Sequence, residues 1–95
     1  MEDKIQLIHP EGKKAVRINK EKYEILKKEI LNALKTKGES TYADMLQYTI
    51  DDFTQNKIVF EGSLEWYLEW VKLDLEARKE IKRVSDKSPL KYTIR

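Results

Sequence analysis

Few side chains in this 95-residue chain have the types and spacing that catalysis or metal binding requires. His9 is the single histidine, and without a cysteine or a nearby carboxylate cluster it makes neither a metal site nor a catalytic triad. Asp51 and Asp52 are adjacent, so they lie on different sides of a helix and lack the glycine-centred spacing of a calcium loop. The turn HPEGKK holds one glycine, too few for a phosphate-binding loop. We therefore expect a protein that is not an enzyme, with no catalytic residue, metal, cofactor or small-molecule substrate.

The composition predicts one domain spanning residues 1–95. Apolar residues make up 40% of the chain and charged residues 38%, with three glycines and two prolines, which is typical of a compact, helix-rich protein. The chain has no cysteine, which excludes disulfides, thiolate metal sites and cysteine nucleophiles. No apolar run approaches the ~18 residues of a membrane span, and the start of the chain lacks the apolar core of a secretory signal. We expect a cytoplasmic protein of bacterial type, without a membrane partner.

Charge is unevenly distributed along the chain, although the formal net charge is only +2. Residues 41–77 hold two basic and eight acidic side chains, whereas residues 78–95 hold seven basic and two acidic ones. Because surfaces of opposite charge attract different molecules, the acidic middle and the basic C-terminal part are expected to face different partners.

The first 18 residues predict a strand or a β-hairpin that precedes the main fold. The runs at 4–8 and 14–18 are short and apolar-rich, and Pro10 and Gly12 between them suit a tight turn. Asn19 then fits the N-cap of a first helix, which is expected to end at Gly38. The apolar residues at helical spacing along this helix are Tyr23, Leu26, Ile30, Ala33 and Leu34.

Two further helices and a second hairpin follow. Thr41 and Asp44 form a start like a capping box for the second helix, and Ser63 suits the N-cap of a third, from about residue 64 to about residue 79. The predicted apolar stripe of the second helix is Leu46, Ile50 and Phe53. The C-terminal LKYTIR alternates apolar and polar side chains, as a strand of a hairpin does. This order predicts an α+β winged helix-turn-helix domain, with three main helices and the C-terminal hairpin as the wing.

The third helix would be the DNA reader of such a domain, yet its polar arc is acidic. Placed at 100° intervals, the residues expected in solvent are Glu65, Glu69, Lys72, Glu76, Lys79 and Glu80. A helix that enters a DNA groove needs Arg, Lys, Asn or Gln there, because phosphates line the groove and base edges are read by such side chains. The arc would repel DNA, and we expect it to be a solvated face with Glu–Lys pairs along the helix.

A second apolar stripe on the third helix contains Trp66, Trp70 and Leu73. The N-terminal hairpin or the first helix could cover this stripe, or the stripe could remain open as a face for a protein partner or a second copy, since tryptophan is enriched among interface anchors. Asp74 and Arg78 lie four residues apart inside the apolar sector. They are expected to form an ion pair, which is either structural, bridging to the wing, or sets the register of a dimer.

Basic residues on the two hairpins are the remaining candidates for nucleic-acid contact. Those on the presumed wing are Lys82, Arg83, Lys87, Lys91 and Arg95, and those on the first hairpin are Lys13, Lys14 and Arg17. They could form a basic edge that keeps the strands soluble, or they could contact phosphates while the third helix reads little sequence. The second alternative predicts weak binding to nucleic acid that falls steeply with salt.

Nearly the whole chain resembles an uncharacterised bacterial family of small winged-helix-like proteins, a domain of unknown function. The resemblance is strongest over WYLEWVKLDLEAR, and it includes GKKAVRINKEKYEILKKEIL near the start and a Pro-Leu pair near the end. The family often has glycine where Lys79 stands and tryptophan where Tyr67 stands. The resemblance implies a fold and a shared core but no activity or ligand. We therefore rank a non-enzymatic module that contacts protein first, and a DNA-binding regulator that uses its wing second.

Overall fold

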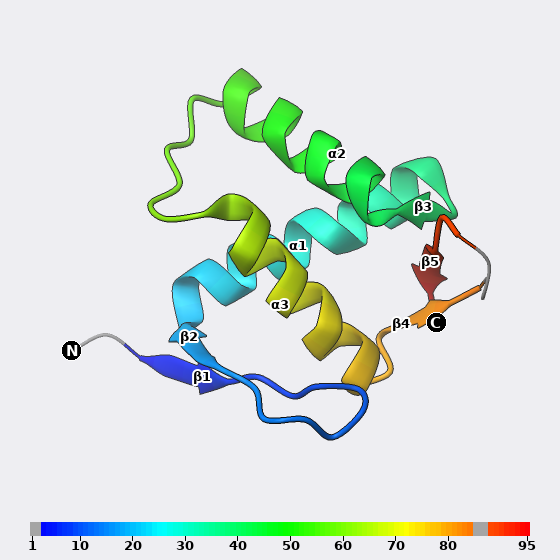
Figure 1. Ribbon diagram of the computed structural model, residues 1–95. Coiled ribbons are helices and arrows are strands. Elements are labelled where there is room, and N and C mark those ends of the chain that lie inside the picture. The colour runs from blue at the N-terminus through cyan, green and yellow to red at the C-terminus, as the bar shows by residue number, and fades with distance from the viewer. Residues whose placement is uncertain (1–2, 85–87) are drawn as a thin grey trace.

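The computed structural model describes residues 3–84 and 88–95, with three helices and two small β-sheets (Figure 1). The elements in chain order are β1 (Lys4–Gln6), β2 (Arg17–Asn19), α1 (Lys20–Lys37), β3 (Ser40–Thr41), α2 (Tyr42–Gln55), α3 (Leu64–Ala77), β4 (Ile81–Arg83) and β5 (Lys91–Ile94). The expected mixed α+β architecture is confirmed at this level.

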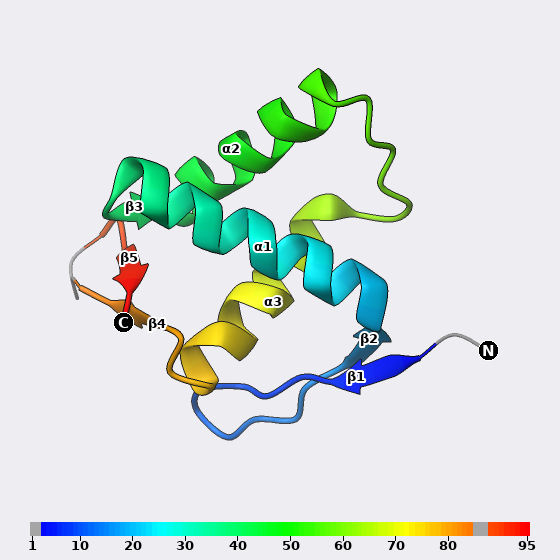
Figure 2. The same ribbon diagram turned by 180° about the vertical axis from the view of Figure 1, so that it is seen from behind.

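Helix α1 packs against α2, α3 and both sheets and supplies much of the core. Asn19 is its N-cap and accepts a hydrogen bond from the backbone N–H of Lys22, which satisfies a donor that the first helical turn leaves free. The helix ends at Gly38, whose φ of 76° is in the left-handed region that glycine tolerates. The five apolar residues predicted for its inner face are all buried. Figures 1 and 2 show α1 behind α3 in one view and in front of it in the other.

The inner face of α2 differs from the prediction by one position. The capping box forms, because Thr41 accepts from the N–H of Asp44 and Asp44 accepts from the N–H of Thr41. The buried residues, however, are Met45, Thr49 and Phe53, while Leu46 is only partly buried and Ile50 is exposed. Burying Thr49 is possible because its hydroxyl donates to the carbonyl of Met45 at 2.9 Å.

Helix α3 begins at the predicted N-cap and ends two residues earlier than expected. Ser63 accepts from the N–H of Trp66 at the start. At the end, the N–H of Glu80 donates to the carbonyl of Leu75 and that of Lys79 donates to the carbonyl of Glu76. This is a Schellman motif, and it places Lys79 at φ 63°, a conformation that glycine adopts more readily. The glycine that the resembling family often has at this position therefore fits the backbone.

Both expected hairpins form, but the second is part of a larger sheet. β1 pairs antiparallel with β2, with Ile5 opposite Ile18. β4 pairs antiparallel with β5, and β3 pairs with the other edge of β5, which gives the strand order β3-β5-β4. The isolated C-terminal hairpin was therefore an incomplete prediction, because β3 has only two residues and such a short strand shows no alternation. β5 is the central strand and buries Tyr92.

Candidate functional site

The stripe of Trp66, Trp70 and Leu73, here called the tryptophan face, lies on the outer side of α3. In Figure 1, α3 is in front of α1 and no described helix or strand lies across it. Trp66 remains 45% exposed, although its ring meets the rings of Tyr67 at 5.0 Å and Trp70 at 6.4 Å between centroids. Trp70 and Leu73 are partly buried. The structure thus brings all three predicted residues to one surface.

The N-terminal segment covers one end of the tryptophan face and leaves the other open. The ring of His9 meets Trp70 edge-on at 6.3 Å between centroids, and Trp70 also packs against the core. The Nδ1 atom of His9 accepts a hydrogen bond from the N–H of Glu11 at 3.0 Å, so this histidine shapes the turn that reaches Trp70. The alternative in which the N-terminal hairpin covers the stripe holds for Trp70, whereas Trp66 stays accessible.

The predicted ion pair between Asp74 and Arg78 forms inside the monomer. Arg78 Nε donates to Asp74 Oδ2 at 2.8 Å. The buried carboxylate also accepts from the hydroxyl of Tyr23 at 2.6 Å and from the N–H of Ile8 at 2.9 Å. Burial and the hydrogen bond to Asp74 raise the pKa of Tyr23, and the hydrogen bond to Asp74 also raises the pKa of Arg78.

These contacts fix the role of the pair in this fold. Asp74 joins α3 to α1 and to the N-terminal segment, and an Arg78 guanidinium nitrogen reaches the carbonyl of Gln6 at 3.3 Å. Among the described residues no hydrogen bond or ion pair joins this pair to the C-terminal hairpin, which was one alternative, and the Asp74 carboxylate is enclosed. A buried charge with three donors holds the two segments in one arrangement.

Lys72 was placed in solvent by the sequence and is instead 3% exposed. Its Nζ donates to Glu76 Oε2 at 3.0 Å and to the hydroxyl of Tyr92 at 3.1 Å, lies 3.6 Å from Glu69 Oε1, and sits over the Tyr92 ring. Burial lowers its pKa, but the hydrogen bond to Tyr92 and the neighbouring carboxylates outweigh this and leave the pKa raised. On the helical wheel Lys72 lies only about 40° from Leu68. This small angle could have predicted that Lys72 lies near the core.

The acidic arc of α3 is therefore largely neutralised by cations. Glu76 pairs with Lys72 and lies 3.8 Å from an Arg83 nitrogen, and Glu80, just past the helix, pairs with Lys27 at 3.2 Å. Of the four glutamates, only Glu65 has no ion pair with a described residue. The expected Glu–Lys pairs along the helix form, whereas the expectation that Lys72 lies in solvent was wrong, because the C-terminal sheet packs on this side of the helix.

The basic residues of the C-terminal hairpin divide between its two faces. The register places Lys82 opposite Thr93, so Lys82, Lys91 and Arg95 share the outer face of the sheet, and all three are exposed. Arg83 lies opposite Tyr92 on the inner face, toward Glu76. Lys87 lies outside the described residues.

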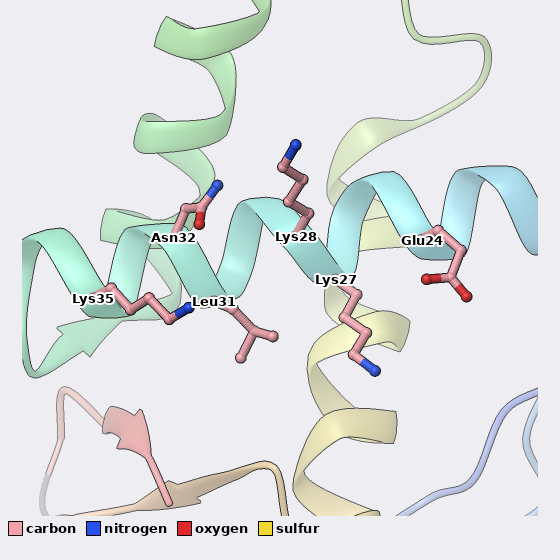
Figure 3. A pocket seen from close by; sticks show the side chains of 6 residues that line it. All are labelled: Glu24, Lys27, Lys28, Leu31, Asn32 and Lys35. Carbon is pink, nitrogen blue, oxygen red and sulfur yellow. The ribbon is translucent and has the colours of Figure 1, made fainter.

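Three hollows formed by described residues have walls that include no residue of the tryptophan face. Figure 3 shows one whose six lining residues, among them Lys27, Lys28 and Lys35, all come from α1, so it is the outer face of a single helix. A second, of about 430 Å³, lies between the start of α2, α3 and β5, and its lining includes Lys72, whose partners are already in place.

Across residues 3–84 and 88–95, no three histidine, cysteine, aspartate or glutamate side chains gather in a way that could hold a metal ion. None of the described helices is long and apolar enough to cross a membrane.

A third hollow, between α1 and α2, contains a residue that the sequence analysis did not single out. Glu29 is 7% exposed and lies among the buried apolar residues of α1. Its spacing carries the signal, because it is three residues after Leu26 and four before Ala33, on the apolar face of the helix. A glutamate at such a position must either find a partner or become neutral.

Comparison with known proteins gives a family for the chain. A search of the curated proteins and a search of the solved structures each found no match. A family model does match, over residues 4–92, and this supports the resemblance to an uncharacterised domain. The chain belongs to a family of unknown function, DUF6958.

Proposed function

We propose that the protein is a non-enzymatic binding module of winged-helix type that docks a protein partner, or a second copy of itself, through the tryptophan face. The order of α1, β3, α2, α3, β4 and β5, together with the strand order β3-β5-β4, supports the winged-helix assignment. In this assignment α3 occupies the position of the recognition helix and β4–β5 the position of the wing.

The observation that carries the proposal is the open position of Trp66 on α3. Trp66 is 45% exposed beside a second tryptophan, and the contact of this apolar surface with water is unfavourable. Large aromatic side chains of this kind contribute much of the binding free energy of protein interfaces. Glu69 lies about 60° and Glu65 about 100° from Trp66 on the helical wheel, at the edge of the tryptophan face. The complementary partner therefore has an apolar centre and a basic rim.

The composition of α3 argues against its use as a DNA reader. Lys72 is the only basic residue between Leu64 and Ala77, and it is buried and fully engaged. An outer face made of Trp66, Leu73 and Glu69 has no donor for phosphates, apart from the indole N–H. Protein contact is thus the better use of this helix.

Site-specific crosslinking and substitution test the proposal. A photoreactive amino acid at Leu73 is expected to capture a defined partner, or a second copy, in cells, whereas the same group at Lys35 on the outer face of α1 does not. Once the captured protein is purified, Trp66→Ser is expected to weaken its binding about 30-fold, the effect of an interface anchor worth about 2 kcal/mol. Val59→Ser is the matched control, because Val59 is 89% exposed and lies in the loop before α3. Light scattering over a concentration series separates self-association from binding to another protein.

The outer face of the C-terminal hairpin supports a second candidate function, a DNA-binding regulator. Lys82, Lys91 and Arg95 surround Thr93 on one exposed face, which is a small basic surface suited to phosphates. Three such contacts predict that affinity for random-sequence duplex falls about 40-fold between 50 and 200 mM salt. Lys82→Glu should remove this binding, while Trp66→Ser should leave it unchanged. A strict monomer that captures no protein and binds no duplex would leave both functions without support.

A further inference from the structure

The hollow between α1 and α2 is lined by two acidic, three apolar and two amide side chains, and by Lys28. It measures about 380 Å³, and its lining includes Ile25 and Glu29 from α1, Asp52 and Phe53 from α2, and Ile58 from the segment that follows. Figure 2 shows α1 from the back of the molecule with α2 beyond it, whereas the tryptophan face is on α3, which is in front in Figure 1. Because none of its lining residues belongs to the tryptophan face, the hollow is separate from the surface proposed for protein docking.

Glu29 carries the observation that points to a ligand. Its side chain is more than nine-tenths buried, and Oε1 has no hydrogen-bond partner among the described residues. Every hydrogen bond to an ionised carboxylate must come from a donor, and a buried carboxylate without one is costly. Lys72, the other buried charge on a pocket wall, differs because its partners are all present.

Asp52 explains how Glu29 is tolerated when the pocket holds no ligand. Burial, followed by a hydrogen bond with Asp52 and the charge of that residue, raises the pKa of Glu29 to about 7, while Lys28 opposes the shift. The neutral acid can donate its proton to the Asp52 carboxylate, as in other pairs of adjacent carboxyl groups. Below about pH 7 the pair therefore holds one proton, which a bound cation would have to displace.

The other lining residues indicate which kind of cation fits beside the carboxyl pair. Ile25 and Ile58 line the pocket and are 39% and 43% exposed, and the buried Phe53 is also part of the lining. Apolar walls favour a ligand with an apolar body, and two carboxyl groups favour a head that donates several hydrogen bonds. A bare divalent ion is a poor fit, because two carboxylates supply fewer oxygens than calcium needs.

We propose that this pocket binds an organic cation, an ammonium or guanidinium head between Glu29 and Asp52 with an apolar body against Ile25 and Ile58. The head replaces the proton that the two carboxyl groups share. Such a head can belong to a free small molecule or to a lysine or arginine side chain of another protein, and both present the same chemistry to the pocket.

Titration of the whole protein with benzylamine and with butylguanidinium, followed by amide chemical shifts in NMR spectra, tests this assignment. At pH 8 we expect both probes to shift the signals of the lining residues, and benzyl alcohol, which lacks the charge, to bind at least tenfold more weakly. Because the cation must displace a proton below pH 7, affinity is expected to fall about 30-fold from pH 8 to pH 5.5. Lys28, Glu29 and Asp52 are the charged residues of the lining, and the raised pKa of Glu29, about 7, lies in that interval.

Two substitutions and one peptide complete the experiment. Glu29→Gln, which has the shape of the neutral acid, and Asp52→Asn should each weaken benzylamine binding at least tenfold, whereas Glu24→Gln, on an exposed part of α1, should not. A blocked Leu-Lys-Leu peptide that binds more tightly than benzylamine identifies a protein side chain as the source of the head, and weaker binding identifies a small molecule. Equal benzylamine binding by Glu29→Gln and the unmodified protein, or no shift of the pocket signals at pH 8, would overturn the proposal.

Discussion

Replacing Glu29 by glutamine should make the protein more stable at neutral and alkaline pH. The pKa of Glu29 is about 7 in the folded protein and about 4.5 without the environment of the fold. Folding therefore favours the protonated form, and its contribution is complete below pH 4.5 and is lost as the pH rises through 7. A shift of this size corresponds to roughly 3 kcal/mol, taken as an upper limit for a group in contact with a second carboxyl.

Glutamine keeps the shape of the neutral acid and can donate to Asp52 at every pH. The free energy of unfolding of Glu29→Gln, minus that of the unmodified protein, should therefore rise between pH 5 and pH 8 by about 2 to 3 kcal/mol. Urea denaturation followed by tryptophan fluorescence or circular dichroism measures this difference at each pH, and subtraction removes the titration of all other groups.

Matched variants separate this effect from a general change of charge. Glu24→Gln removes the same charge from an exposed position of the same helix, and its difference from the unmodified protein should stay within about 0.5 kcal/mol across the range. Asp52→Asn should reduce the pH dependence, because the neighbouring charge helps to raise the pKa of Glu29. A flat difference for Glu29→Gln between pH 5 and pH 8 would refute the view that this carboxyl is held neutral by burial.

Three further predictions concern stability. Lys79→Gly should stabilise the protein by about 1 kcal/mol and raise its Tm by about 4 to 8 °C in thermal denaturation, because the residue at this helix end has φ 63°; an unchanged or lower Tm would contradict the Schellman assignment. Asp74→Ala should lower the free energy of urea unfolding by about 3 kcal/mol, because it leaves the Tyr23 hydroxyl and two other donors without their acceptor, and Tyr23→Phe should cost about 1 to 2 kcal/mol; equal losses for the two variants would show that the aspartate has no role beyond the tyrosine. Trp66→Ser should lower the free energy of unfolding by about 1 kcal/mol, because its half-buried ring still packs against Tyr67 and Trp70, whereas Leu68→Ala, a fully buried position on the same helix, should cost about 2 to 5 kcal/mol; a loss for Trp66→Ser as large as that for Leu68→Ala would mean that the tryptophan serves the fold rather than a partner.

Local signals in the sequence were sufficient for the helices and their caps. Asn19, Thr41 and Ser63 each cap the helix that they were expected to cap, because capping depends on residues three or fewer positions away. The inner face of α1 was predicted correctly because its apolar spacing continues over 18 residues. The inner face of α2 was not, because Thr49 counts as polar in any periodicity although its hydroxyl is satisfied within the helix.

Contacts between distant parts of the chain were beyond the reach of the sequence pattern. Asp74 and Arg78 could be paired from their spacing, but Ile8 and Tyr23, 66 and 51 residues away from Asp74, could not be identified as further donors. Lys72 looked exposed because the partner that buries it, Tyr92, lies 20 residues later on β5. The long aliphatic stem of a lysine allows it to cross an apolar surface and end on polar atoms, and no periodicity shows where those atoms are.

The burial of Lys72 changes the surface that α3 presents to a binding partner. The sequence suggests that four glutamates would repel DNA. In the structure, however, Glu76 and Glu80 form ion pairs and Glu69 lies near Lys72, so most of this negative charge is balanced by cations of the same chain. A stronger reason against DNA binding by α3 is that Lys72, the one basic residue of the helix, already donates to Glu76 and Tyr92. The helix therefore has no charged donor left for a phosphate. An acidic helix could still approach DNA if arginines stood among its acids, whereas the outer face of α3 consists of tryptophan, leucine and glutamate, and this composition supports the proposed contact with protein.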